Sequence, residues 1–181
     1  MAPTTCLSLM LIISLLFTIS QAISPTISPT SNSNLYKIIC KEPIEFKDFE
    51  QRCLKLLEAY PQITLAEDYL TFTKLFLKKL AIGKAIKAKQ QMKEIMNKYP
   101  SSQVIKECFF DHSKVLEELQ IAYYEEPGTI SLDVAYASDA LDACDHSLSN
   151  EKFVDISSIS ILNDAMRLVV YIAYTSSSHI N

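Results

Sequence analysis

"ECFFDHSKVLEEL", residues 107–119, places a cysteine, a histidine and aliphatic residues at spacings of three and four. Such spacing is typical of a helix with one buried face. The stretch "ASDALDACDHSL", residues 137–148, has the same character and again sets a cysteine close to a histidine and aspartates. The two stretches therefore predict two amphipathic helices, whose cysteines serve either chemistry or structure.

The N-terminal residues indicate export. Residues 1–22 carry no ionisable side chain, and their apolar run at 7–17 is shorter than the about 20 residues that span a bilayer. Ser20 and Ala22 supply the small residues of a cleavage site, so this segment is predicted to be a secretory signal peptide. Residues 23–34 are rich in Ser, Thr and Pro and predict a flexible leader. Residues 35–181 form one domain by length, without a further membrane-spanning segment.

Four cysteines remain once the signal peptide is removed: Cys40, Cys53, Cys108 and Cys144. An even count in an oxidising compartment predicts two disulfides. Three pairings are possible, and the spacings alone do not choose among them.

A metal site or a cysteine nucleophile is the alternative for the two quoted stretches. Residues two apart on a helix point about 200° away from each other, so Cys144 and His146 cannot share a ligand. Cys108 and His112, four apart, could hold a metal together with Cys144, but the remaining ligands are not apparent. An exported thiol that faces another is oxidised, which disfavours a nucleophile. We therefore expect a disulfide between two helices here, and His112 in or near the core.

Charge and motifs exclude several function classes. The net charge is -4, with a basic region at 64–98 and an acidic one at 101–150. These regions could steer a charged partner, but the preferred interpretation is that they pair with each other. Phosphate-binding loops, nucleophile elbows and zinc-protease motifs are absent from the sequence. Asp142 and Asp145 could act as acid and base, but a solvated acidic face is the preferred interpretation. We expect no catalytic residue, metal, cofactor or nucleic-acid partner.

The whole of residues 35–181 has the pattern of helices. Glycine occurs only twice in the chain. A helix is predicted to end at Pro61, and Thr64 with Glu67 is predicted to cap a long helix that bends at Gly83. Three more amphipathic helices are expected near 104–122, 132–148 and 159–173, the second with an apolar face that begins at Leu132. The prediction is an all-α, up-and-down four-helix bundle with an N-terminal helical hairpin.

This arrangement resembles the plant invertase and pectin methylesterase inhibitor family. The resemblance rests on the order of the four cysteines, on residues 108–119 and 137–148, and on "LNDAM" at 162–166, where the Asn and Asp are shifted from the family pattern. It implies sequential pairing, Cys40 with Cys53 and Cys108 with Cys144. It also implies a monomeric, secreted protein of the apoplast, cell wall or vacuole that inhibits an enzyme and catalyses nothing itself.

The resemblance leaves the target open between pectin methylesterase and acid invertase. Invertase inhibitors of the family carry Pro-Lys-Phe in the loop between the two helices that bear the last cysteines. The corresponding loop is the expected target-contact loop here and consists of Glu125, Glu126, Pro127, Gly128 and Thr129. It lacks the cation and the aromatic residue, which favours pectin methylesterase as the target. A helical carrier or storage protein for a small apolar ligand is the alternative of another class.

Overall fold

The computed structural model describes residues 34–42, 46–149 and 156–180, so the predicted signal peptide and nearly all of the leader lie outside the described residues. Residues 31–181 form one compact unit. The part of this unit that the structure describes consists of helices and contains no strand. In chain order the helices are α2 (Leu35–Cys40), α3 (Phe49–Glu58), α4 (Pro61–Thr64), α5 (Tyr69–Phe76), η1 (Leu77–Ala81), α6 (Ile82–Lys98), α7 (Gln103–Tyr124), α8 (Ile130–Ser149) and α9 (Ser157–Ser177).

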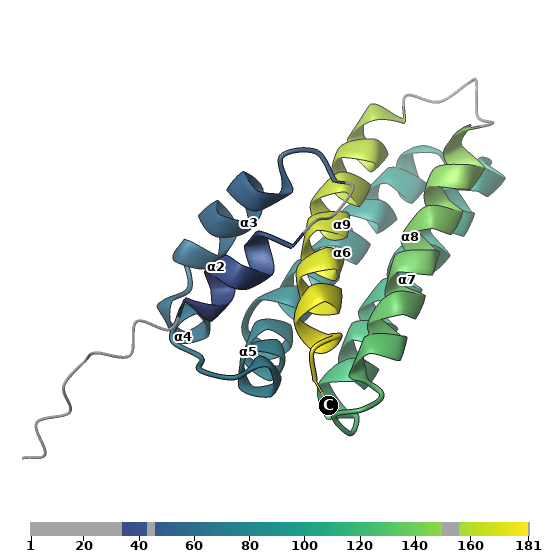
Figure 1. Cartoon of the computed structure of the whole chain (residues 1–181). Helices are drawn as coiled ribbons and strands as arrows, with labels where there is room; N and C mark the ends of the chain where they lie inside the picture. Colours follow the sequence, from purple (N-terminus) through teal and green to yellow (C-terminus); the bar gives the residue numbers. More distant parts are fainter. Residues whose placement is uncertain (1–33, 43–45, 150–155, 181) are drawn as a thin grey trace, which may run out of the picture. The chain divides into compact units, whose positions relative to one another are not determined.

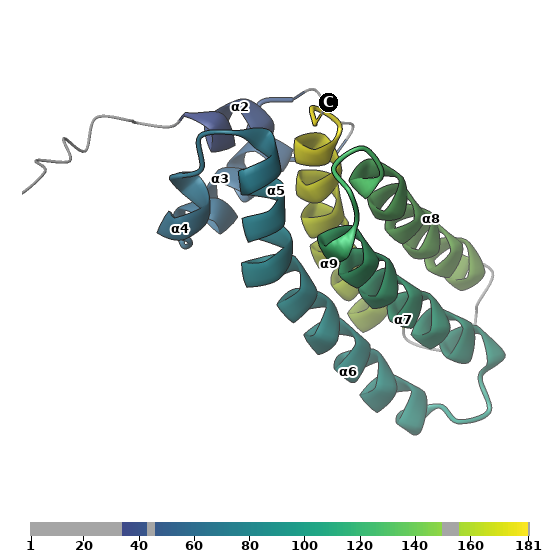
Figure 2. The same cartoon turned by 90° about the horizontal axis from the view of Figure 1, so that it is seen from below.

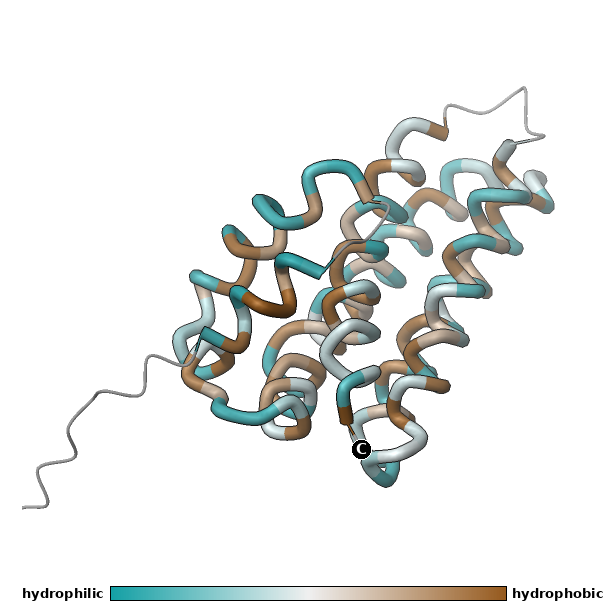
Figure 3. Tube along the Cα trace, viewed as in Figure 1, coloured by the Kyte–Doolittle hydropathy of each residue, from teal (hydrophilic) through white to brown (hydrophobic). Residues whose placement is uncertain are grey.

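The predicted four-helix bundle with an N-terminal hairpin is confirmed. The path α5–η1–α6 and the helices α7, α8 and α9 run side by side, and α2 and α3 pack on α9 (Figures 1 and 2). Hydrophobic and hydrophilic segments alternate along the longer helices (Figure 3), as the spacing of apolar residues predicts. The largest fully buried side chains include Phe72, Phe76, Leu77, Leu119, Ile130 and Leu141.

The start of the long helix differs from the sequence prediction. Thr64 is the last residue of α4, and its hydroxyl donates to the carbonyl of Pro61 at 3.2 Å, so it caps nothing that follows. Asp68 is the N-cap of α5 and accepts a hydrogen bond of 2.8 Å from the backbone N–H of Thr71. That backbone hydrogen bond lowers the pKa of Asp68. Asp68 therefore caps the helix, in place of the predicted capping box of Thr64 and Glu67.

The predicted bend at Gly83 is replaced by a change of helix type. The π-helical turn η1 lies just before Gly83, which does not have a positive φ. A π turn inserts extra backbone into an α-helical path and so shifts the face that the following helix presents. The helices α5 and α6 are therefore two differently oriented parts of the predicted long helix.

The helices α7 and α8 pack through their predicted apolar faces. Ser102 caps α7 by accepting from the backbone N–H of Ile105 at 3.3 Å. On α8 the predicted face is correct except at its start, because Leu132 is 51% exposed whereas Ile130 is fully buried. The buried residues of α7 are Ile105, Cys108, His112, Val115, Leu119 and Ala122.

Both disulfides pair as the family resemblance implies. Cys40 of α2 and Cys53 of α3 form the hairpin disulfide, with Cα atoms 5.5 Å apart. Cys108 of α7 and Cys144 of α8 form the bundle disulfide, with Cα atoms 4.6 Å apart. The four cysteines of the two disulfides are fully buried. The cross-links therefore fix the N-terminal hairpin and the α7–α8 pair from within.

Candidate functional site

The cluster of reactive side chains at the bundle disulfide cannot work as a thiol site. Ligand atoms of Cys108, Asp111 and Cys144 lie within 4.8 Å of one another. Both sulfurs are consumed by the disulfide, however, and a metal requires the thiolate. His146, the histidine nearest in sequence to Cys144, is exposed on another side of α8.

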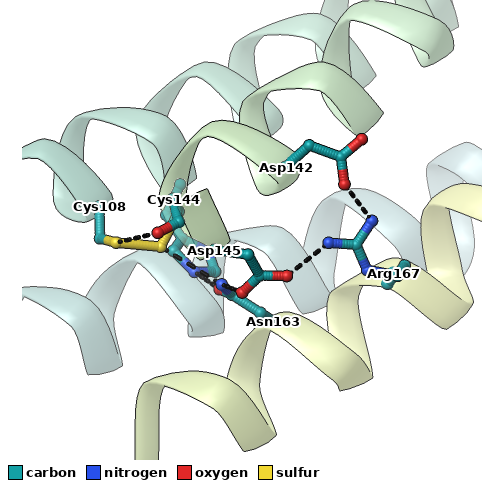
Figure 4. Close-up of polar contacts among 7 residues, drawn as sticks. Cys108, Asp142, Cys144, Asp145, Asn163 and Arg167 are labelled. Atoms are coloured by element: carbon teal, nitrogen blue, oxygen red, sulfur yellow. Dashed lines mark hydrogen bonds and ion pairs between the residues drawn. A yellow bond between two sulfur atoms is a disulfide. The ribbon is translucent and has the colours of Figure 1, made fainter. Parts of the chain in front are cut away.

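A chain of polar contacts extends from the bundle disulfide to α9 (Figure 4). The side-chain amide of Asn163, which is 1% exposed, donates to Oδ1 of Asp145 at 2.5 Å and to the sulfur of Cys144 at 3.3 Å. Its carbonyl oxygen lies 2.7 Å from Nε2 of His112. Because that oxygen can only accept, Nε2 of His112 is the protonated ring nitrogen. Asn163 thus links α7, α8 and α9.

His112 is a core residue, as the sequence predicted. It is 1% exposed, and its Nδ1 has no hydrogen-bond partner. Burial lowers its pKa, against the opposing effects of the Asn163 hydrogen bond and the nearby Asp145 carboxylate. A neutral imidazole enclosed in this way has no access to a substrate and serves packing.

Asp142 and Asp145 are not simply a solvated acidic face, which corrects the sequence interpretation. Arg167 of α9 donates to Oδ1 of Asp142 at 2.5 Å and to Oδ2 of Asp145 at 2.6 Å. Its own burial would lower the pKa of Arg167, but the two carboxylates hold that pKa above its usual value. The two aspartates therefore form salt bridges that join α8 to α9, and their carboxylates are engaged with Arg167.

Sequence reasoning did not identify Asn163 or Arg167 as members of this network. A local signal exists for Asn163, which follows the buried Ile159 by four residues and precedes the buried Met166 by three. A polar residue within a core stripe needs a buried partner. The partners come from α7 and α8, far away in the sequence, so the pattern along α9 cannot name them.

The predicted contact loop, residues 125–129, forms a tight turn between α7 and α8. Lys74 of α5 donates to the carbonyl oxygens of Ala122, Tyr123 and Glu125 at 3.3, 2.6 and 2.7 Å. These are carbonyls that the end of a helix leaves without intrahelical partners. Desolvation lowers the pKa of Lys74, while the aromatic and acidic groups of the turn oppose that change. A single lysine thus holds the end of α7 in place.

The turn itself is held by Thr129. Its hydroxyl lies 3.1 Å from Oε2 of Glu125 and 3.0 Å from the carbonyl oxygen of Glu126. Gly128 is exposed and does not have a positive φ, and a Cβ added there would meet no atom within 4 Å. Position 128 can therefore accept a larger residue, whereas the side chain at position 129 is engaged in hydrogen bonds within the turn.

Exposed apolar side chains gather in sequence on both sides of this turn. On α7, Ile121 is 38% and Tyr124 83% exposed. On α8, Leu132 and Tyr136 are 51% and 43% exposed. Residues three or four apart on a helix share a face, so each pair forms a short stripe. We call these four residues together with residues 125–129 the turn-end surface.

Carboxylates add negative charge to the same end of the bundle. Glu118 and Asp133 face each other across α7 and α8, and burial together with neighbouring carboxylates raises the pKa of both. Aromatic and aliphatic groups with a polar rim are typical of protein interfaces. The turn-end surface is thus a candidate surface for binding another protein.

The basic and acidic regions of the chain were predicted to pair. Between their described residues, Lys74 interacts electrostatically with Glu125 and Glu126, but without a direct ion pair. No ion pair within 4.0 Å joins the described lysines of 64–98 to the described acidic residues of 101–149. Lys74 reaches backbone carbonyls instead, and the ammonium of Lys89 lies 6.0 Å from the ring centroid of Phe109. The lysines of α6 therefore form no ion pair within 4.0 Å with a described carboxylate.

Comparison with known proteins identifies the fold. No protein-family model and no curated protein matches the chain. Among solved structures, the crystal structure of a pectin methylesterase inhibitor from Arabidopsis thaliana superimposes with a TM-score of 0.55 at 16% identity, over 83% of this chain and 98% of that one. No described helix is long and apolar enough to cross a membrane. The chain thus has the disulfide-linked helical-bundle fold of the pectin methylesterase inhibitor.

Proposed function

We propose that the protein is a secreted inhibitor of pectin methylesterase, which it binds non-covalently so that the substrate cleft is blocked. The observation that carries this proposal is the likeness to an inhibitor of that enzyme over 98% of the inhibitor's chain. Two disulfides are typical of proteins that fold in oxidising compartments, in keeping with secretion.

Inhibition by this protein would be steric and would require no chemistry of its own. Lys74 and Thr129 hold the turn between α7 and α8, and the bundle disulfide and the Asn163 network join the same two helices at their opposite ends. A partner that binds a surface already fixed in this way loses little conformational entropy of the inhibitor on binding. We assign the contact to the turn-end surface, with Tyr124 as its most exposed aromatic residue.

Pectin methylesterase is preferred to acid invertase because of the side chains at the turn. Invertase inhibitors of the family present a lysine and a phenylalanine after the proline, whereas Pro127 is followed here by Gly128 and Thr129. Without a cation the turn cannot pair with acidic catalytic groups, and Thr129 is engaged with Glu125 and Glu126. Acid invertase is therefore the second candidate target.

The test is a titration of the disulfide-intact protein, without residues 1–22, against purified pectin methylesterase and acid invertase at pH 5 to 6. Saturable inhibition of the esterase alone supports the proposal. Inhibition of the invertase alone assigns the second target, and an absence of both at large molar excess refutes the inhibitor function.

Two variants test the assigned surface. Tyr124→Ala should weaken inhibition by at least tenfold, as the loss of an aromatic anchor does. Phe110→Ala is the matched control, because Phe110 is 74% exposed on the same helix but lies four turns from Tyr124. Equal inhibition by both variants would remove the turn-end surface from the contact. A Gly128→Lys variant tests whether a restored cation adds inhibition of invertase, because position 128 has room for a larger side chain.

A further inference from the structure

A groove runs along the seam between α6 and α9, away from the turn-end surface. It consists of two cavities of about 310 and 360 Å³ that share Gln91, Leu162 and Ala165 as lining residues and are therefore continuous. Together they have the size of a site for a small ligand. We call this the α6–α9 groove.

Most of the groove is apolar. In the first cavity the lining includes the buried side chains of Ala88, Met166 and Val169. The second cavity is lined by the half-buried Ile95 and by Ile161, which is 71% exposed. No described apolar side chain covers Ile161. A ligand bound over Ile161 would therefore remove apolar surface from water.

The positive charge lies at one end of the groove. Lys84 and Lys87 line the first cavity, are exposed and form no ion pair within 4.0 Å with a described residue. Arg52 also lines that cavity, but both of its terminal nitrogens are bound to Asp164, at 3.2 and 2.7 Å. The resulting net charge at this end is that of the two lysines.

The other end of the groove is close to neutral. Glu94 and Lys98, which line the second cavity, carry opposite charges one helical turn apart. From Lys87 to Lys98 the groove follows α6 for roughly 16 Å at 1.5 Å per residue. A cationic end next to an apolar channel of this length is complementary to one carboxylate followed by one unbranched alkyl chain.

We propose that the α6–α9 groove binds a fatty acid with an unbranched alkyl chain of about the length of laurate. The carboxylate lies between the ammonium groups of Lys84 and Lys87, and the chain passes over Leu162 and Ala165 toward Ile161. Because Ala165 is small, the chain can lie close to the backbone of α9. This site shares no residue with the turn-end surface, so it is independent of enzyme inhibition and would hold if the proposed function failed.

The test is calorimetric titration of the disulfide-intact protein, without residues 1–22, with laurate below its micelle concentration. We expect saturable one-to-one binding at micromolar concentrations, with octanoate at least tenfold weaker because each methylene lost from an apolar contact weakens binding. Dodecyltrimethylammonium, which has the same chain and the opposite charge, should bind at least tenfold more weakly than laurate. An absence of saturable laurate binding overturns the proposal, as does equal affinity for the two charges.

Charge reversal locates the site. Lys84→Glu combined with Lys87→Glu should lower laurate affinity at least tenfold. The matched control, Lys79→Glu with Lys93→Glu, makes the same change of charge at exposed positions that do not line the groove, and should leave the affinity unchanged. An equal loss in both double variants would mean a general charge effect and overturn the proposal. So would binding to vesicles of phosphatidylglycerol with no binding of monomeric laurate.

Discussion

Replacement of Asn163 by leucine tests whether the buried polar network stabilises the bundle. Leucine has the same branching and the same number of side-chain heavy atoms as asparagine, so the change removes hydrogen bonds without leaving a cavity. It leaves the Nε2–H of His112 without an acceptor in a site where Nδ1 already has no partner. It also removes one donor from Asp145, which keeps Arg167.

The expected loss of stability follows from these contacts. An orphaned buried donor costs about 1–3 kcal/mol, and a lost hydrogen bond to a charged acceptor adds roughly 1 kcal/mol or more. Asn163→Leu should therefore lower the free energy of unfolding by about 2–4 kcal/mol, which corresponds to a fall in Tm of roughly 5–15 °C in a domain of this size. Urea unfolding at pH 7 with the disulfides intact measures the effect.

A double variant separates the orphaned histidine from general damage to the core. His112→Leu in the Asn163→Leu background removes the stranded donor, and replacing both partners with apolar groups can be nearly neutral. The double variant should thus regain at least half of the lost stability. If it is less stable than Asn163→Leu alone, or if Asn163→Leu changes stability by less than 0.5 kcal/mol, the reasoning about the network is wrong.

Three further predictions concern pH, the disulfides and the end of α7. Because burial lowers the pKa of His112 below its unfolded value of about 6.5, stability should decrease as the pH falls through 6.5 toward the folded pKa, and unfolding curves of His112→Leu should lack this component. Removal of the hairpin disulfide or the bundle disulfide by paired Cys→Ala changes should lower the free energy of unfolding in urea by about 3 and 4 kcal/mol respectively, as expected from the lengths of the two closed loops. Lys74→Met should destabilise the protein by about 1–3 kcal/mol and speed hydrogen exchange at the amides of residues 125–129, whereas Lys79→Met, at an exposed position, should do neither.

The helices could be predicted because their apolar spacing is a local property. On α8 the buried residues from Val134 to Leu148 follow one another at three and four, and the sequence pattern contains that regularity. The first turn was misassigned because Ile130 and Leu132 both lie where a face could begin, and only packing decides between them. The disulfide pairing was available from the family resemblance and not from the spacing of the cysteines.

The polar contacts could not be predicted, since each joins residues distant in the sequence. Arg167 lies 25 residues from Asp142 and 22 from Asp145, and Lys74 lies about 50 residues from the carbonyls that it holds. The capping error at Thr64 has a different cause. Thr64 and Asp68 are both acceptable N-caps by residue type. Thr64 is the last residue of the short helix α4, however, so Asp68 caps the helix that follows.

The stretch around Cys108 and Cys144 shows why a chemical constellation in sequence is weak evidence of catalysis. Its cysteines bind each other, its histidine is enclosed and its aspartates hold Arg167. The sulfurs, the aspartates and Nε2 of His112 have partners within the bundle, and Nδ1 of His112 is buried out of reach of a substrate. The surface, in contrast, carries exposed tyrosines beside a fixed turn, and lysines along an apolar groove that form no ion pair with a described carboxylate. These surface groups, unlike the buried cluster, are within reach of a binding partner.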